Sequence, residues 1–345
     1  STMGGTFSGT ATEGDISDSG NLAITGAATF ITAQAAQEII LDQANAFTSH
    51  VTMKAGDGTA AFDNITFKDS GGVNLHTAAA SAGDLFIDAG TNLAVGGALS
   101  ITATTGNITQ GSELAVGTTS TFTTSASNAT ITLNDVDNTF TGALALNTTG
   151  SSGNATIKND RAILLAASTV GGAFSATATA GNITQSGALA IAGATTLVTS
   201  GVGADIDLTT DTNAFTGQLL ITTNETGSDI DADVSIDGGT TNLIIGTSTI
   251  DGDLALRSGG TITDTDSSTV TVKGTLSATT DASNSVITLN DLAVTGAFTL
   301  APHGTGAVTI VNQAGLNLAA STMGGTFSGT ATTGNITQSG ALDIA

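Results

Sequence analysis

Residues 168–192 read STVGGAFSATATAGNITQSGALAIA, and residues 193–214 continue with GATTLVTSGVGADIDLTTDTNA. Each line holds short alternating segments, such as Leu189-x-Ile191 and Ile206-x-Leu208, and Gly, Asn, Asp or Ser separates them. Alternation of apolar and polar residues predicts β-strands with one buried side, and the separating residues favour turns. Lines of 22 to 32 residues built in this way are typical of the coils of a β-solenoid.

The same phrases recur along the whole chain. GNITQ stands at residues 106–110, 181–185 and 334–338, with weaker copies at 14–18 (GDISD) and 260–264 (GTITD). A second phrase, Ile-x-Leu followed by a polar turn, keeps step with the first. Two markers at matching offsets predict one continuous body of four units, with the start of a fifth: 1–92, 93–167, 168–247, 248–320 and 321–345.

Composition decides between two all-β architectures. The 345 residues include no Trp, no Tyr, no Cys and one Pro, Pro302. A narrow solenoid core takes small and branched apolar residues, and its parallel ladders exclude Pro. Tandem immunoglobulin-like β-sandwiches of about 80 residues are the alternative, but their Trp and Tyr landmarks and linkers are missing. We therefore expect a parallel β-helix of about 13 coils, each advancing about 4.8 Å.

Three phrases resemble a known family. SGALAIAGATTL (186–197), ADIDLTTDTNAFTGQLLI (204–221) and NATITLNDVDNTFTGALAL (128–146) are similar to the β-strand repeats of giant bacterial surface proteins, especially filamentous-haemagglutinin-like adhesins. The resemblance covers essentially the whole chain. It implies a right-handed parallel β-helix, secretion, and a place at the cell surface.

The phrase STMGGTFSGTAT occurs at residues 1–12 and again at residues 321–332. The chain thus begins and ends in the same repeat. Bare strand edges at the end of a solenoid pair with other strands. We expect either a segment of a longer repetitive chain or separate chains that stack end to end, and both produce a fibre.

The net charge of the chain limits the classes of partner that it can bind. The formal net charge is −23, with 29 acidic and six basic residues. Such a surface repels nucleic acid and anionic membrane, and no apolar run is long enough to span a bilayer. The expected partners are other copies of the chain, along the axis and laterally, and host or neighbouring cell surfaces.

No catalytic constellation is visible. The three histidines, His50, His76 and His303, share no spacing, and no hydrolase, metalloprotease or nucleotide-binding motif occurs. Sugar-cleaving β-helix enzymes need aromatic platforms and basic residues, which are missing or scarce here. We therefore expect no enzyme and no organic cofactor.

Calcium is the one expected ligand. Carboxylates alternate in SDIDADVSID (228–237), so they would share one face of a strand about 7 Å apart and repel unless solvated or bridged by a hard cation. The alternative is a solvated acidic face. The predicted metal ligands are Asp229, Asp231, Asp233, Asp205, Asp207, Asp264 and Asp266.

The first unit is the longest, and its extra residues lie near Met53–His76. A segment that departs from a regular solenoid is a common place for binding. An extra pair of strands packed on the body is the alternative. The candidate binding residues are Lys54, Phe62, Phe67, Lys68 and His76.

These features predict a structural, non-catalytic β-solenoid of an extracellular fibre or surface filament. The alternative is the shaft of a secreted adhesin that attaches cells to one another or to surfaces.

Overall fold

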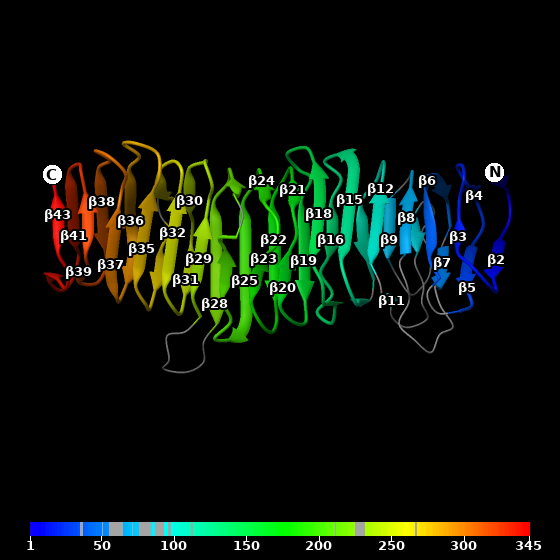
Figure 1. Ribbon diagram of the computed structural model, residues 1–345, viewed down its shortest axis with the longest axis horizontal. Coiled ribbons are helices and arrows are strands. Elements are labelled where there is room, and N and C mark those ends of the chain that lie inside the picture. The colour runs from blue at the N-terminus through cyan, green and yellow to red at the C-terminus, as the bar shows by residue number, and fades with distance from the viewer. Residues whose placement is uncertain are drawn as a thin grey trace. The chain divides into compact units, whose positions relative to one another are not determined.

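The computed structural model describes residues 1–34, 37–49, 51–54, 65–70, 72–75, 84–86, 93–95, 98–111, 113–210, 212–224, 232–265 and 268–345 (Figure 1). Every regular element in these ranges is a β-strand, so no described helix exists that could cross a membrane. The chain divides into two compact units, Ser1–Gly172 and Ala173–Ala345.

Unit 1 consists of short strands separated by tight turns. They are β1 (Thr2–Met3), β2 (Phe7–Ala11), β3 (Ile16–Ser17), β4 (Ala23–Ile24), β5 (Ala28–Thr32), β6 (Ile39–Phe47), β7 (Val51–Lys54), β8 (Ile65–Asp69), β9 (Gly72–Leu75), β10 (Asp84–Phe86), β11 (Leu93–Val95), β12 (Leu99–Ala103), β13 (Ile108–Gln110), β14 (Leu114–Val116), β15 (Ser120–Ser127), β16 (Ile131–Leu133), β17 (Thr139–Phe140), β18 (Leu144–Thr149), β19 (Ala155–Asn159), β20 (Ile163–Leu165) and β21 (Ser168–Val170).

Unit 2 is built in the same way. Its strands are β22 (Phe174–Ala178), β23 (Ile183–Gln185), β24 (Leu189–Ile191), β25 (Thr195–Val202), β26 (Ile206–Leu208), β27 (Ala214–Phe215), β28 (Leu219–Asn224), β29 (Val234–Asp237), β30 (Leu243–Ile245), β31 (Ser248–Ile250), β32 (Leu254–Ser258), β33 (Ile262–Asp264), β34 (Val270–Val272), β35 (Leu276–Thr280), β36 (Ile287–Val294), β37 (Ala297–Ala301), β38 (Val308–Asn312), β39 (Leu316–Leu318), β40 (Ser321–Met323), β41 (Phe327–Ala331), β42 (Ile336–Gln338) and β43 (Leu342–Ile344).

The strands of each unit form parallel ladders. As a rule, a strand pairs with the third strand after it, as β12 does with β15 and β15 with β18 in unit 1, and as β22 does with β25 and β25 with β28 in unit 2. Three strands therefore make one winding of about 22 residues, and the described strands of the two units make about 13 windings. The predicted parallel β-solenoid is confirmed. The alternative of antiparallel sandwiches is wrong, because every described strand pair is parallel.

The core is a set of stacked columns of side chains. Along β12, Leu99, Ile101 and Ala103 are buried while the residues between them are half-buried. Ile101 lies in register between Phe67 of β8 and Phe122 of β15, so each inward side chain packs on its neighbours above and below. Burial of alternate residues along the strands of the inner windings is the main stabilising contribution of this architecture.

The phenylalanines of the first windings form one such column. Phe7, Phe30, Phe47 and Phe67 follow one another with ring centroids 5.1, 6.1 and 5.5 Å apart. These distances and the tilted or edge-on orientations are those of favourable aromatic pairs. These four phenylalanines thus contribute to the core.

The 80-residue sequence repeat is not a whole number of windings. In unit 2, β32 is the equivalent of β22 in the next repeat and is the tenth strand after it, whereas a winding holds three strands. The two strands accordingly lie in different sheets, since β22 pairs with β25 and β32 pairs with β29 and β35. Equivalent segments of successive repeats therefore occupy successive sides of the winding.

Candidate functional site

The acidic residues of unit 2 connect one winding to the next. Asp205 Oδ1 accepts a hydrogen bond from the backbone N–H of Asp233 at 2.9 Å, and Asp233 Oδ1 accepts one from Asp253 N–H at 2.7 Å. Asp253 Oδ1 in turn accepts one from Thr275 N–H at 2.6 Å. Asn182 begins the series by accepting from Asp205 N–H at 2.9 Å. This column, Asn182–Asp205–Asp233–Asp253, caps backbone donors at one corner of four windings.

Glycine makes room for these caps. A Cβ at Gly252 would collide with Asp233 Oδ1 and would lie 2.7 Å from the carbonyl carbon of Ala232. The carboxylate thus rests directly on the glycine of the next winding. This close approach leaves no room for a side chain at position 252.

Those predicted calcium ligands that the structure describes do not form a metal cluster. Asp207 Oδ1 accepts hydrogen bonds from the N–H and the hydroxyl of Thr209, in its own turn, at 3.2 and 2.6 Å. Within the described ranges no group of three His, Asp or Glu side chains could hold a metal ion. Asp229, Asp231 and Asp266 lie outside those ranges, so calcium binding stays a prediction.

Asp264 occupies a different corner. Its Oδ2 accepts hydrogen bonds from two successive backbone donors of the next winding, Asn290 N–H at 2.7 Å and Asp291 N–H at 2.8 Å. Burial of the carboxyl group raises the pKa of Asp264 above its usual value, against the opposing effect of these two hydrogen bonds. Asp264 is therefore another connector between windings.

The candidate binding segment is described in part. Phe67 is 1% exposed and belongs to the phenylalanine column, so it offers no surface to a ligand. Lys68 follows it in β8 and is half-buried. Lys54 ends β7, and its side chain lies outside the described part, as do Phe62 and His76. A binding role for this segment stays a prediction that no longer includes Phe67.

A buried amide cluster was not predicted from the sequence. Asn213 is 2% exposed, and its Oδ1 accepts hydrogen bonds from Leu189 N–H at 2.9 Å and from Gln185 Nε2 at 3.0 Å. Its Nδ2 donates to Gln185 Oε1 at 2.9 Å and to the carbonyls of Leu208 and Asp237, both at 3.0 Å. One side chain thus binds the preceding winding, its own winding and the following one.

The same cluster recurs in unit 1. Asn138 and Gln110 exchange hydrogen bonds of 2.7 and 2.9 Å, and Asn138 Oδ1 also accepts from Leu114 N–H at 2.9 Å. In the first windings Asp18 replaces the glutamine, and its Oδ2 accepts from Asn45 Nδ2 at 2.7 Å. The Gln of GNITQ is therefore one half of a structural pair. The spacing of 28 residues from Gln110 to Asn138 and from Gln185 to Asn213 is the signal that would have revealed it.

In the part of the chain that the structure describes, Arg161, Arg257 and Lys273 form ion pairs. Arg161 donates from Nε to Asp160 Oδ1 at 2.7 Å, and this hydrogen bond lowers the pKa of Asp160. This exposed pair contributes little to stability. Lys273 pairs with the buried Asp251, from the neighbouring winding of the ladder that joins β31 to β34.

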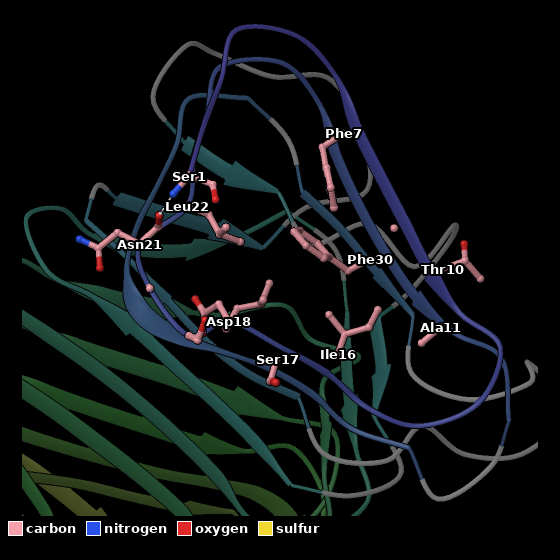
Figure 2. A pocket seen from close by; sticks show the side chains of 14 residues that line it. Ser1, Phe7, Thr10, Ala11, Ile16, Ser17, Asp18, Asn21, Leu22 and Phe30 are labelled. Carbon is pink, nitrogen blue, oxygen red and sulfur yellow. Dashed lines mark hydrogen bonds between the residues drawn. The ribbon is translucent and has the colours of Figure 1, made fainter.

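Two of the hollows in the described part are large enough to be considered as binding sites. The first has a volume of about 490 Å³ and is lined by Phe7, Ile16, Leu22 and Phe30, with Asp18 beside them (Figure 2). Its half-buried Phe7 and Ile16 are in register with the fully buried Ala28 and Ile39. The first hollow is therefore the apolar interior of a winding.

The second hollow, of about 460 Å³, lies on the outer side of β29, β32 and β35. Small residues, Ser235, Ala255 and Ser277, line it together with Arg257. Arg257 is engaged by Asp281, through Nε at 2.9 Å and Nη2 at 3.2 Å. Neither hollow brings together an acid, a base and a nucleophile in the manner of a catalytic site.

Comparison with known protein families gives a match over most of the chain. A family model described as "Repeats of unknown function (DUF5649)" matches residues 1–54, 82–147, 152–222, 231–302 and 305–345. No curated protein and no solved structure matches the chain.

Proposed function

The chain belongs to the family of repeats of unknown function, DUF5649, and from that premise we propose that it is a structural, non-catalytic segment of an extracellular fibre or surface filament. In this proposal the function of the chain is to form the solenoid itself. Its windings join end to end through strand edges, and it acts outside the cell without a cofactor. The partners are further copies of the same repeats.

One observation carries the proposal. Residues 1–12 and 321–332 have the same sequence and form equivalent strands, β2 and β41. In the first copy β2 pairs with β5, the strand of the following winding, whereas in the second copy β41 pairs with β38, the strand of the preceding winding. This winding sequence is thus compatible with a neighbour on either side, which is what joining in series requires.

The side-chain caps support the same conclusion. In the column Asn182–Asp205–Asp233–Asp253 each side chain accepts from the winding that follows it, and the two amide clusters also bridge adjacent windings. Stability in such an array is a sum of local terms and contacts between neighbours. A solenoid of this kind can be extended by further windings that use the same contacts between neighbours.

Electron microscopy and fibre diffraction of the purified full chain test the proposal. We expect filaments one solenoid wide and a meridional reflection near about 4.8 Å, the spacing of parallel strands. Ile336→Asp should abolish axial joining, because Ile336 continues the core column of Leu316. Thr337→Asp is the matched control, since Thr337 continues the outward column of Asn317. Isolated particles under all conditions, or filaments unaffected by Ile336→Asp, would contradict the proposal.

The adhesin shaft is distinguished by a binding assay. Attachment of the full chain to cells that is lost on deletion of residues 55–64 would favour a shaft that carries its own binding segment. Filaments that bind no cell favour the purely structural role.

A further inference from the structure

Charge is unevenly distributed in unit 2. Residues 173–204 contain no acidic, basic or histidine side chain, in a chain with 29 acidic and six basic residues. These residues form β22, β23, β24 and β25, which is more than one complete winding. A stretch of surface without charge is therefore present on an otherwise strongly acidic molecule.

One side of the winding extends this neutral surface. The outward residues of β22, β25 and β28 are in register: Ser175 with Thr196 and Leu220, and Thr177 with Val198 and Thr222. The second column continues from Thr222 to Thr249 of β31 and Thr271 of β34. We call these eight residues the neutral face: Ser175, Thr177, Thr196, Val198, Leu220, Thr222, Thr249 and Thr271.

The next side of the winding has a different character. Its outward columns run from Asp207 through Ser235 and Ala255, and from Asp237 to Arg257. The acidic column of Asp205, Asp233 and Asp253 lies at the corner beside it. Charged residues thus line this side of unit 2, whereas none belongs to the eight residues of the neutral face.

We propose that the neutral face is a lateral docking surface for a second copy of this chain, with the two neutral faces packed against each other. Two molecules of net charge −23 repel each other wherever their acidic surfaces meet. Close approach therefore costs the least electrostatic free energy where both surfaces are uncharged. The β-branched residues and Leu220 form a flat sheet surface of the kind that packs face to face about 10 Å apart.

The area sets the strength of this contact. Three strands of about five residues and two of three residues, with about 3.3 Å per residue and about 4.8 Å between strands, cover about 330 Å² per copy. A total of about 660 Å² lies below the size of a standard stable interface, so a single pair of faces associates weakly. Repetition along joined solenoids multiplies such contacts, and the avidity rises without any new interaction. The docking itself does not require that filaments form.

Cysteine cross-linking locates the contact, because the chain has no cysteine of its own. Thr196→Cys places a thiol on the neutral face, and Thr299→Cys places one on the outward side of β37 as the control. A bis-maleimide about 10 Å long, the separation of packed sheets, should link two copies of Thr196→Cys and leave Thr299→Cys unlinked. Equal cross-linking of the two variants would overturn the proposal.

Sedimentation equilibrium gives the affinity. The Ile336→Asp chain, in which axial joining is blocked, is the suitable background. Its dimer fraction should rise with salt, because screening at about 0.5 M reduces repulsion between the acidic surfaces. In this background Val198→Asp with Leu220→Asp should weaken association about a hundredfold, whereas Val198→Thr with Leu220→Thr should keep it. Circular dichroism checks that each variant is folded.

An Ile336→Asp chain that stays monomeric at about 1 mM and about 0.5 M salt refutes lateral docking. So does a charged variant that associates as well as the Ile336→Asp chain alone. Since Ile336→Asp blocks axial joining and leaves the neutral face intact, failure of the filament proposal and failure of this one give different results.

Discussion

The amide cluster around Asn213 allows a quantitative test of how the windings are held together. In Asn213→Ala the buried N–H of Leu189 and the carbonyls of Leu208 and Asp237 lose their partner, and Gln185 loses both of its hydrogen bonds to Asn213. An unsatisfied buried polar group costs about 1–3 kcal/mol. With partial relief by water entering the space, we expect a loss of about 3–5 kcal/mol of unfolding free energy.

Urea unfolding followed by far-ultraviolet circular dichroism is the suitable measurement, since the chain has no Trp or Tyr to report by fluorescence. Solenoids unfold in parts, so hydrogen exchange of residues 183–215 should accompany it. Asn317→Ala, on the outward side of β39, is the control, with an expected loss below about 0.5 kcal/mol. A double-mutant cycle with Gln185→Ala should show coupling between the two amides.

The reasoning is refuted if Asn213→Ala loses less than about 1 kcal/mol, because the buried backbone groups would then have found other partners. It is equally refuted if exchange in residues 183–215 does not accelerate, since the cluster bridges the windings that this segment contains.

Four further outcomes follow from the fold. Because burial raises the pKa of Asp264, the folded protein holds the carboxyl proton of this residue more tightly than the unfolded chain does. The unfolding free energy should therefore fall as the pH rises from about 4, and Asp264→Asn should remove this part of the pH dependence. Gly252→Ala forces the Asp233 carboxylate off the next winding and should cost about 1–3 kcal/mol in urea unfolding, whereas Gly20→Ala, with open space around it, should be neutral. Phe67→Ala should cost about 3–5 kcal/mol, as a core residue does; a near-neutral result would place the ring outside the core. If the calcium prediction holds, calcium raises the melting temperature and a chelator lowers it, and an unchanged melting curve excludes it.

Much of the fold was accessible from the sequence because its signals are local. Alternation in segments such as Leu189-x-Ile191 marks the buried side of a strand, and glycine marks the corners. The repeat phrases then place equivalent strands along the chain. The predicted architecture was confirmed at this level, including the short windings and the absence of sandwich domains.

The contacts between windings were harder to predict because they depend on register. Asp205 and Asp233 stand in two separate acidic segments of the sequence, and only the pairing of β26 with β29 shows that the carboxylate of Asp205 caps the N–H of Asp233. In the sequence alone, Phe67 lies in an irregular segment. Its place in the core becomes clear only from the pairing of β8 with β6 and β12. Gln185 and Asn213 needed the further step of matching a fixed offset in two repeats.

The repeat of three and a third windings has a consequence for the outer surface of unit 2. A residue shared by successive 80-residue repeats faces a different side of the winding in each repeat, as equivalent positions of β22 and β32 do. Copying one repeat therefore distributes its outward side chains over different sides of the winding and does not build a one-sided stripe. A one-sided stripe requires similar outward residues at non-equivalent strands of successive repeats. A one-sided feature on this solenoid therefore marks sequence divergence between its repeats.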